Sequence, residues 1–153
     1  MKNMSDRIWI GIDADVEKSG IAIWTENQLS IYKMKFFKLF SVLEQYSYIK
    51  DNKLRDDLKV KVVIEAGWLN KRSNWHSSGQ GENIASRIGK NVGANHQVGK
   101  LIVEMCEYLG LEYELHQPVS SKMGIRQFRM MSGYKGKLDQ DCVDSALLVY
   151  GRV

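Results

Sequence analysis

Two short apolar stretches, each ending in a single acidic residue, constrain the fold of this chain more than any other feature. The first covers residues 7–13 (RIWIGID) and ends at Asp13, and the second covers residues 60–65 (VKVVIE) and ends at Glu65. Their β-branched and aromatic residues are typical of buried strands. A carboxylate at the tip of a buried strand costs free energy unless a partner compensates its charge. Two strands of this kind therefore suggest a metal site.

The other elements are expected in the order β β β α β α β α α. A helix between the third and fourth strands is long enough for a crossover, so the Glu65 strand is expected to lie parallel to the first strand. Both acids would then share the carboxyl edge of one sheet. The patterns predict strands over residues 19–24, 28–35 and 111–117, and helices over residues 36–50, 83–109 (continuous or broken), 120–131 and 138–150.

Length and hydropathy favour one soluble domain spanning residues 1–153, with 44% hydrophobic residues. No apolar run approaches the roughly 18 residues of a membrane span, and the first residues, MKNMSDR, lack the apolar core of a signal peptide. We expect a cytoplasmic protein of a bacterial or phage-infected cell. Cys106 and Cys142 fit no metal-ligand spacing and are expected to be buried, reduced thiols.

Basic residues are segregated along the chain, although the net charge is only +4. Residues 83–103 and 117–138 contain lysines and arginines but no acid. This distribution fits a polyanionic partner such as nucleic acid, and fits a solvated basic face equally well. The candidate nucleic-acid contacts in these segments are Arg87, Lys90, Arg126, Arg129, Lys135 and Lys137.

Residues 66–82 form the longest irregular stretch and begin directly after Glu65. Lys71, Arg72 and Trp75 combine charge with an aromatic ring, as in contacts to a nucleic-acid backbone and its bases. The alternative is that tryptophans of this stretch, Trp68 among them, cover an edge of the core. The position next to Glu65 favours the functional interpretation.

The long helix contains glycines at positions 89, 93 and 99, each costing about 1 kcal/mol relative to alanine in a helix. Close backbone approach would compensate, with the sheet, a second subunit or DNA as the neighbour. His96 is interpreted as a structural polar residue.

Two further acids lie three residues apart at the start of the last helix. Asp141 and Asp144 share one helix face, where like charges repel unless both serve another purpose, such as metal binding. Asp139 is the expected N-cap.

Taken together, these motifs resemble the RuvC-type Holliday-junction resolvases of the ribonuclease H-like superfamily. The resemblance implies an α/β, ribonuclease H-like fold with a five-stranded mixed sheet of order 3-2-1-4-5, flanked by helices. It rests on GID at residues 11–13, IE at 64–65, DCVDSAL at 141–147, RIGKNVGANHQVG at 87–99, and PVSSK at 118–122.

The chemistry that follows is two-metal phosphodiester hydrolysis. Hard Mg²⁺ prefers oxygen ligands, and Mn²⁺ is expected to substitute for it. In this interpretation Asp13 bridges two ions, Glu65 and Asp144 each hold one, and Asp141 completes the set or orients water. The resemblance makes Lys122 a candidate for contacting the scissile phosphate or for stabilising the charge that builds up during the reaction. The alternative for each acid is a salt bridge or a helix cap.

We therefore expect a Mg²⁺-dependent, structure-selective DNA endonuclease that cuts four-way junctions in recombination and repair. Two symmetric nicks require two sites, and the resemblance implies a two-fold homodimer. The first alternative is a related nuclease acting on flaps, other branched DNA or RNA. The second is a non-catalytic nucleic-acid-binding domain. The presence of the acidic residues expected to bind metal argues against it.

Overall fold

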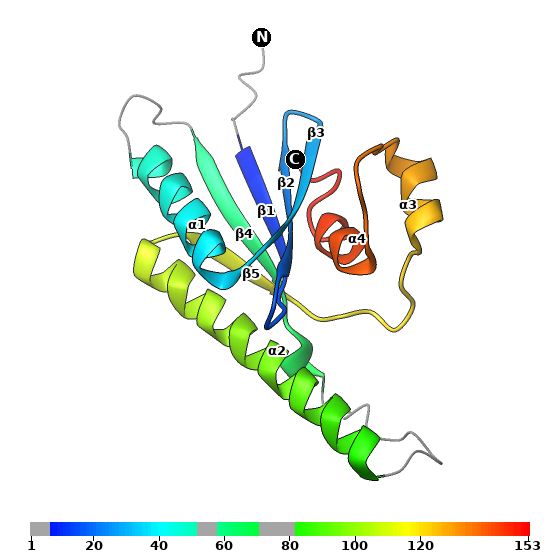
Figure 1. Cartoon of the computed structure of the whole chain (residues 1–153). Coiled ribbons are helices and arrows are strands. Elements are labelled where there is room, and N and C mark those ends of the chain that lie inside the picture. Colours follow the sequence, from blue (N-terminus) through cyan, green and yellow to red (C-terminus); the bar gives the residue numbers. More distant parts are fainter. Residues whose placement is uncertain (1–6, 52–57, 71–81) are drawn as a thin grey trace.

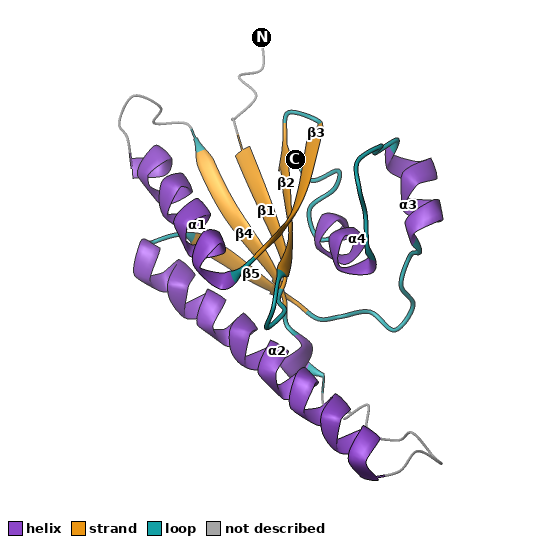
Figure 2. Cartoon of the chain, in the orientation of Figure 1, coloured by secondary structure: helices purple, strands orange, loops and turns teal. Residues whose placement is uncertain are grey.

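A computed structural model describes residues 7–51, 58–70 and 82–153, with the backbone alone for residue 50 and residues 82–89. The fold is a mixed sheet with helices on both faces (Figures 1 and 2). The central strand β1 (Arg7–Asp13) pairs antiparallel with β2 (Ser19–Thr25) and parallel with β4 (Lys59–Glu65). The edge strands are β3 (Gln28–Met34), antiparallel to β2, and β5 (Glu112–His116), parallel to β4. The order β3-β2-β1-β4-β5 confirms the expected sheet.

The helices form the two outer layers. On one face lie α1 (Phe36–Asp51) and the 28-residue α2 (Glu82–Leu109), and on the other lies α4 (Gln140–Leu147) with α3 (Ile125–Ser132) outside it (Figure 1). The crossover through α1 makes β1 and β4 parallel, as expected. None of the helices in the described part of the chain is both long and apolar enough to cross a bilayer.

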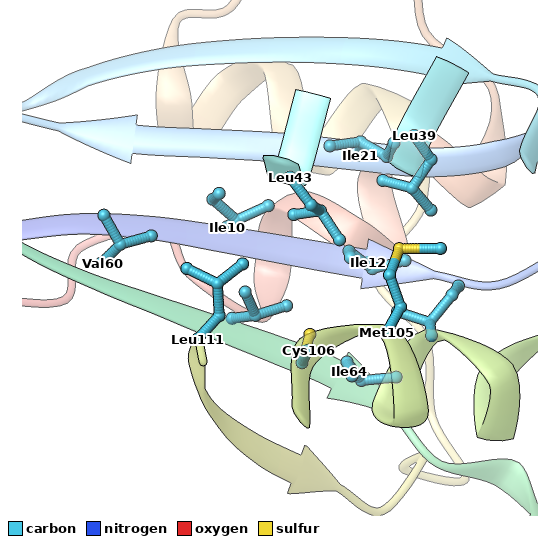
Figure 3. Close-up of a cluster of buried hydrophobic side chains, with 12 residues drawn as sticks. Ile10, Ile12, Ile21, Leu39, Leu43, Val60, Ile64, Met105, Cys106 and Leu111 are labelled. Atoms are coloured by element: carbon cyan, nitrogen blue, oxygen red, sulfur yellow. The ribbon is translucent and has the colours of Figure 1, made fainter. Parts of the chain in front are cut away.

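Alternation along β1 divides the core in two. Ile10 and Ile12 point to the α1 and α2 side, where they pack in the cluster drawn in Figure 3. Trp9 belongs to the second cluster, on the α4 side. Full burial of one such side chain contributes about 1.5–3 kcal/mol. The two layers therefore hold β1, and with it Asp13, in a fixed position.

Of the two forms expected for the long helix, continuous or broken, the structure shows the continuous one. Two other helix boundaries differ from the sequence-based expectations. The basic helix starts at Ile125, because Gly124 is extended with φ −78° and ψ 167°, so residues 118–124 are irregular. The last helix ends at Leu147, and a turn follows up to Gly151, whose φ is +78°. Cys106 and Cys142 are buried and free, as expected.

The structure tests the expected close packing at two of the three helix glycines, because Gly89 lies outside the described side chains. A Cβ on Gly99 would lie 2.5 Å from the Trp68 ring, so this glycine makes room for a tryptophan. A Cβ on Gly93 would meet nothing within 4 Å, so the expectation of a close backbone neighbour is wrong at this glycine. Trp68 packs against the core, which fits the alternative that it covers a core edge.

Candidate metal centre

Asp13 and Glu65 meet at the carboxyl ends of two parallel neighbours. The parallel register pairs Ile12 with Ile64, and the two acids come next in each strand. Since side chains alternate along a strand and Val63 faces α4, Glu65 faces the same side. By the same alternation Asp13 faces away from the α1 layer, toward α4.

Two glycines let α4 approach the sheet closely enough to bring a third carboxylate. A Cβ on Gly11 would lie 2.2 Å from the backbone oxygen of Ser145, and a Cβ on Gly20 would lie 2.5 Å from that of Asp141. Neither backbone oxygen can move without shifting the helix. The small residues in GID and SG thus place Asp144 over the end of β1.

These three carboxylates form a group that can hold a metal ion. Ligand oxygens of Asp13, Glu65 and Asp144 all lie within 4.8 Å of one another. Side-chain exposure is 13% for Glu65 and 7% for Asp144, so the group lies at the border of the core. A set of oxygen donors without histidine or cysteine matches the preference of hard cations such as Mg²⁺ or Mn²⁺.

Asp144 already has polar partners on both oxygens. The Lys122 ammonium donates to Oδ2 at 2.7 Å and lies 4.0 Å from Oε1 of Glu65. The Gln140 amide donates to Oδ1 at 2.9 Å. Burial by itself lowers the pKa of Lys122, but the hydrogen bond to Asp144 and the nearby acids outweigh it and raise that pKa. The lysine therefore stays charged and partly neutralises the cluster.

Asp13 has the most perturbed acidity in the site. Burial, followed by the charge of Glu65, raises the pKa of Asp13 from 3.8 to about 8. The two side chains also share a hydrogen bond. In the absence of a cation, Asp13 therefore holds a proton at neutral pH, which relieves the repulsion between the carboxylates.

Asp141 is not part of this cluster. Its Oδ2 accepts a hydrogen bond from Lys33 of β3 at 2.7 Å, and the same ammonium lies 3.2 Å from Oδ2 of Asp139. Burial would lower the pKa of Lys33, but its hydrogen bonds to Asp141 and Asp139 raise it to about 12. Asp139 also caps α4, as expected, by accepting from the Cys142 amide at 2.9 Å. A ligand role for Asp141 stays a prediction.

A cavity of about 710 Å³ opens over Asp13 and Glu65, and its other walls come from η1 (Gly67–Leu69), α2 and residues 117–122. This volume is typical of ligand sites. Asn95 of α2 accepts from the Val16 amide at 2.9 Å and so ties the turn after β1 to this wall. His96 also lines the cavity and lies edge-to-face with Trp68, with centroids 6.3 Å apart.

The predicted nucleic-acid contacts lie on several elements. Lys90 on α2, Arg126 on α3, and Lys135 and Lys137 before α4 are exposed. Arg129 is partly buried, and its guanidinium donates to the Tyr134 carbonyl at 3.0 Å, which ties the end of α3 to the next segment. Outside the described residues or side chains lie Lys71, Arg72, Trp75 and Arg87.

No family model and no curated protein sequence matches this chain. Among solved structures, the chain is similar to T. thermophilus RuvC in complex with a Holliday junction substrate. The similarity covers 94% of this chain and 90% of that chain, with 10% sequence identity and a TM-score of 0.44. Similarity at this level does not establish an activity, which has to be inferred from the site itself.

The sequence interpretation missed Lys33 and Gln140 as partners of the acids. The partner role of Lys33 could have been predicted from strand alternation. Lys33 lies on the same face of β3 as Leu29 and Ile31, which pack toward the α4-side core. A charge on a core-facing position predicts a nearby partner. Gln140 follows the cap residue Asp139 and had no comparable signal.

Proposed function

We propose that this chain is a Mg²⁺-dependent, structure-selective DNA endonuclease that cuts four-way junctions. It would act in the cytoplasm as a homodimer, each chain forming one nuclease domain. The observation that supports this most is the convergence of Asp13, Glu65 and Asp144 within 4.8 Å from three elements far apart in sequence. They line or adjoin an open cavity with Lys122 at its edge.

Each residue of the site would have a separate role in hydrolysis. Asp13, Glu65 and Asp144 would hold the divalent cations, and Asp13 would contribute to the binding of both. Asp141 would become a further ligand when its side chain is released from Lys33. When bound, such cations neutralise the phosphate, lower the pKa of the attacking water and stabilise the leaving oxygen. Gln140 keeps Asp144 oriented.

Lys122 would change partners during the reaction. In this structure its ammonium compensates Asp144 and Glu65. A cation at the carboxylates would supply that positive charge, leaving Lys122 to contact the scissile phosphate. Because its side chain is 47% exposed, it can turn toward the cavity without unpacking the core.

The exposed cations Lys90, Arg126, Lys135 and Lys137 would bind the DNA backbone. From the sequence alone, we include Lys71, Arg72, Trp75 and Arg87 among these contacts. Binding through several phosphates makes affinity fall steeply with salt.

The test is cleavage of synthetic four-way junctions by the pure protein. We expect paired, symmetric nicks in Mg²⁺ or Mn²⁺ and none in EDTA. A panel of flaps, replication forks, duplex DNA and RNA–DNA hybrids separates junction resolution from the alternative of a related nuclease. Tight junction binding without cleavage of any substrate would contradict the nuclease proposal. It would favour the alternative of a non-catalytic nucleic-acid-binding domain.

A further inference from the structure

We propose that Lys33 is a positioning residue that withholds Asp141 from the carboxylate cluster and thereby limits the free protein to one divalent cation. The inference rests on the proposed metal-dependent function. It concerns the regulation of that site, because a second cation would need Asp141 to be released from Lys33.

The contacts of Lys33 carry the inference. Its ammonium lies 2.7 Å from Oδ2 of Asp141 and 3.2 Å from Oδ2 of Asp139. The side chain of Lys33 is 28% exposed and that of Asp141 is 42% exposed, so water partly screens the pair, and the two short contacts define its geometry. The Lys33 ammonium thus contacts the carboxylates of both Asp139 and Asp141. Asp141 therefore has its negative charge compensated by a side chain of the protein and needs no metal ion.

The backbone keeps this arrangement in place. Lys33 pairs with Gly20 in the β2–β3 register, and Gly20 lies under the backbone of Asp141. Lys33 therefore emerges beside the first turn of α4. Asp139 fixes the same turn through its bond to the Cys142 amide.

Asp141 is nevertheless close to the cluster. It lies near enough to Asp13 for their charges to interact, and it is three residues before Asp144 on α4. We infer that release of Asp141 from Lys33 lets its side chain join the cation site. The three remaining acids, together with Lys122, form a site suited to one cation in the absence of substrate.

A purely structural role is the alternative. In that case Lys33 only neutralises the acidic start of α4, and its removal lowers stability without changing cation binding. Stoichiometry separates the two roles, because a general loss of positive charge would strengthen binding without adding a site.

The experiment is titration of the DNA-free protein with Mn²⁺, followed by calorimetry and by the electron paramagnetic resonance signal of free Mn²⁺. We expect one ion per chain for the wild type and two for Lys33→Met. Lys33→Arg keeps the charge and should bind one. In the double variant Lys33→Met/Asp141→Asn the added site should be lost. Lys35→Met, an exposed lysine two residues away, is the matched control and should bind one.

The single variant Asp141→Asn tests the same inference without removing Lys33. Its Mn²⁺ affinity should stay within about threefold of the wild type, because Asp141 is withheld. A tenfold loss would overturn the inference, as would two ions on the wild type or one ion on folded Lys33→Met. If neither the wild type nor Lys33→Met binds Mn²⁺ at millimolar concentration, the proposed metal-dependent function itself fails.

Discussion

At the scale of single residues, Asp13 is the group whose protonation depends most on what the site contains. Burial and Glu65 raise the pKa of Asp13 to about 8, against an ordinary value of 3.8. Between these values the folded, cation-free protein keeps a proton that the unfolded chain has released. Stability contributed by that proton is present at low pH and is lost as pH rises from about 4 to about 8.

Asp13→Asn should separate this stability effect from activity. A neutral amide needs no proton, so the variant should melt about 3–6 °C above the wild type in EDTA at pH 8, and the difference should shrink toward pH 4. Cleavage should fall to about one-thousandth of the wild-type rate or less, with junction binding retained. Differential scanning fluorimetry and gel-based cleavage measure the two effects.

The control is Glu17→Gln, an exposed acid four residues away in the turn after β1. It should change neither melting temperature nor cleavage rate appreciably. Full cleavage by Asp13→Asn would remove Asp13 from the mechanism.

Cation binding should itself depend on pH. Below the pKa of Asp13, which is about 8, a cation must displace its proton, so affinity should rise up to about tenfold per unit from pH 6 to pH 8 and then level off. Calorimetry at pH 7 in buffers of different ionisation enthalpy should detect nearly one proton released per ion. An affinity that is flat from pH 6 to pH 9 would show that Asp13 is already ionised.

At the scale of elements, the contact of α4 with β1 places Asp144 in the site, and Gly11 permits that contact. Gly11→Ala would put a methyl group 2.2 Å from the Ser145 carbonyl, a position where backbone and not a flexible side chain must move. We expect a loss of about 2–3 kcal/mol in unfolding free energy and weaker cation binding, because Asp144 shifts with the helix. Urea denaturation and Mn²⁺ titration measure both.

Gly93→Ala is the matched control, since its Cβ would meet nothing within 4 Å in the middle of α2. It should raise the unfolding free energy by about 0.5–1 kcal/mol and leave cation binding unchanged. Equal effects of the two substitutions would mean that close packing at Gly11 does not position α4.

The elements and the three clustered acids could be predicted because their signals are local. Strand alternation, a crossover of helical length and an acid at each strand end suffice to bring Asp13 and Glu65 together. The side-chain pairing of Lys33 with Asp141 spans 108 residues and depends on how closely α4 approaches Gly20. Nothing in a local pattern sets that distance. The predicted start of the basic helix at residue 120 was wrong, because Gly124 is extended and the helix begins after it, at Ile125.

At the scale of the whole molecule, symmetric resolution requires two complete sites acting on one junction. The described residues of one chain contain one such carboxylate cluster. On the proposed function, a homodimer with a single intact cluster should therefore cut one strand only. Heterodimers of wild-type and Asp13→Asn chains, isolated through two different tags, should convert a plasmid-borne cruciform to the nicked circle. Wild-type dimers should convert it to the linear form.

The control is a wild-type dimer that carries the same two tags, which should linearise the plasmid as the untagged protein does. If the chain acted as a monomer, no stable heterodimer could be isolated, and a mixture of the two chains would still linearise the plasmid at a reduced rate. Accumulation of nicked circles from purified heterodimers therefore tests two points together. It requires that strand cleavage depends on Asp13 of each chain, and that the two chains stay paired on one junction through both cuts.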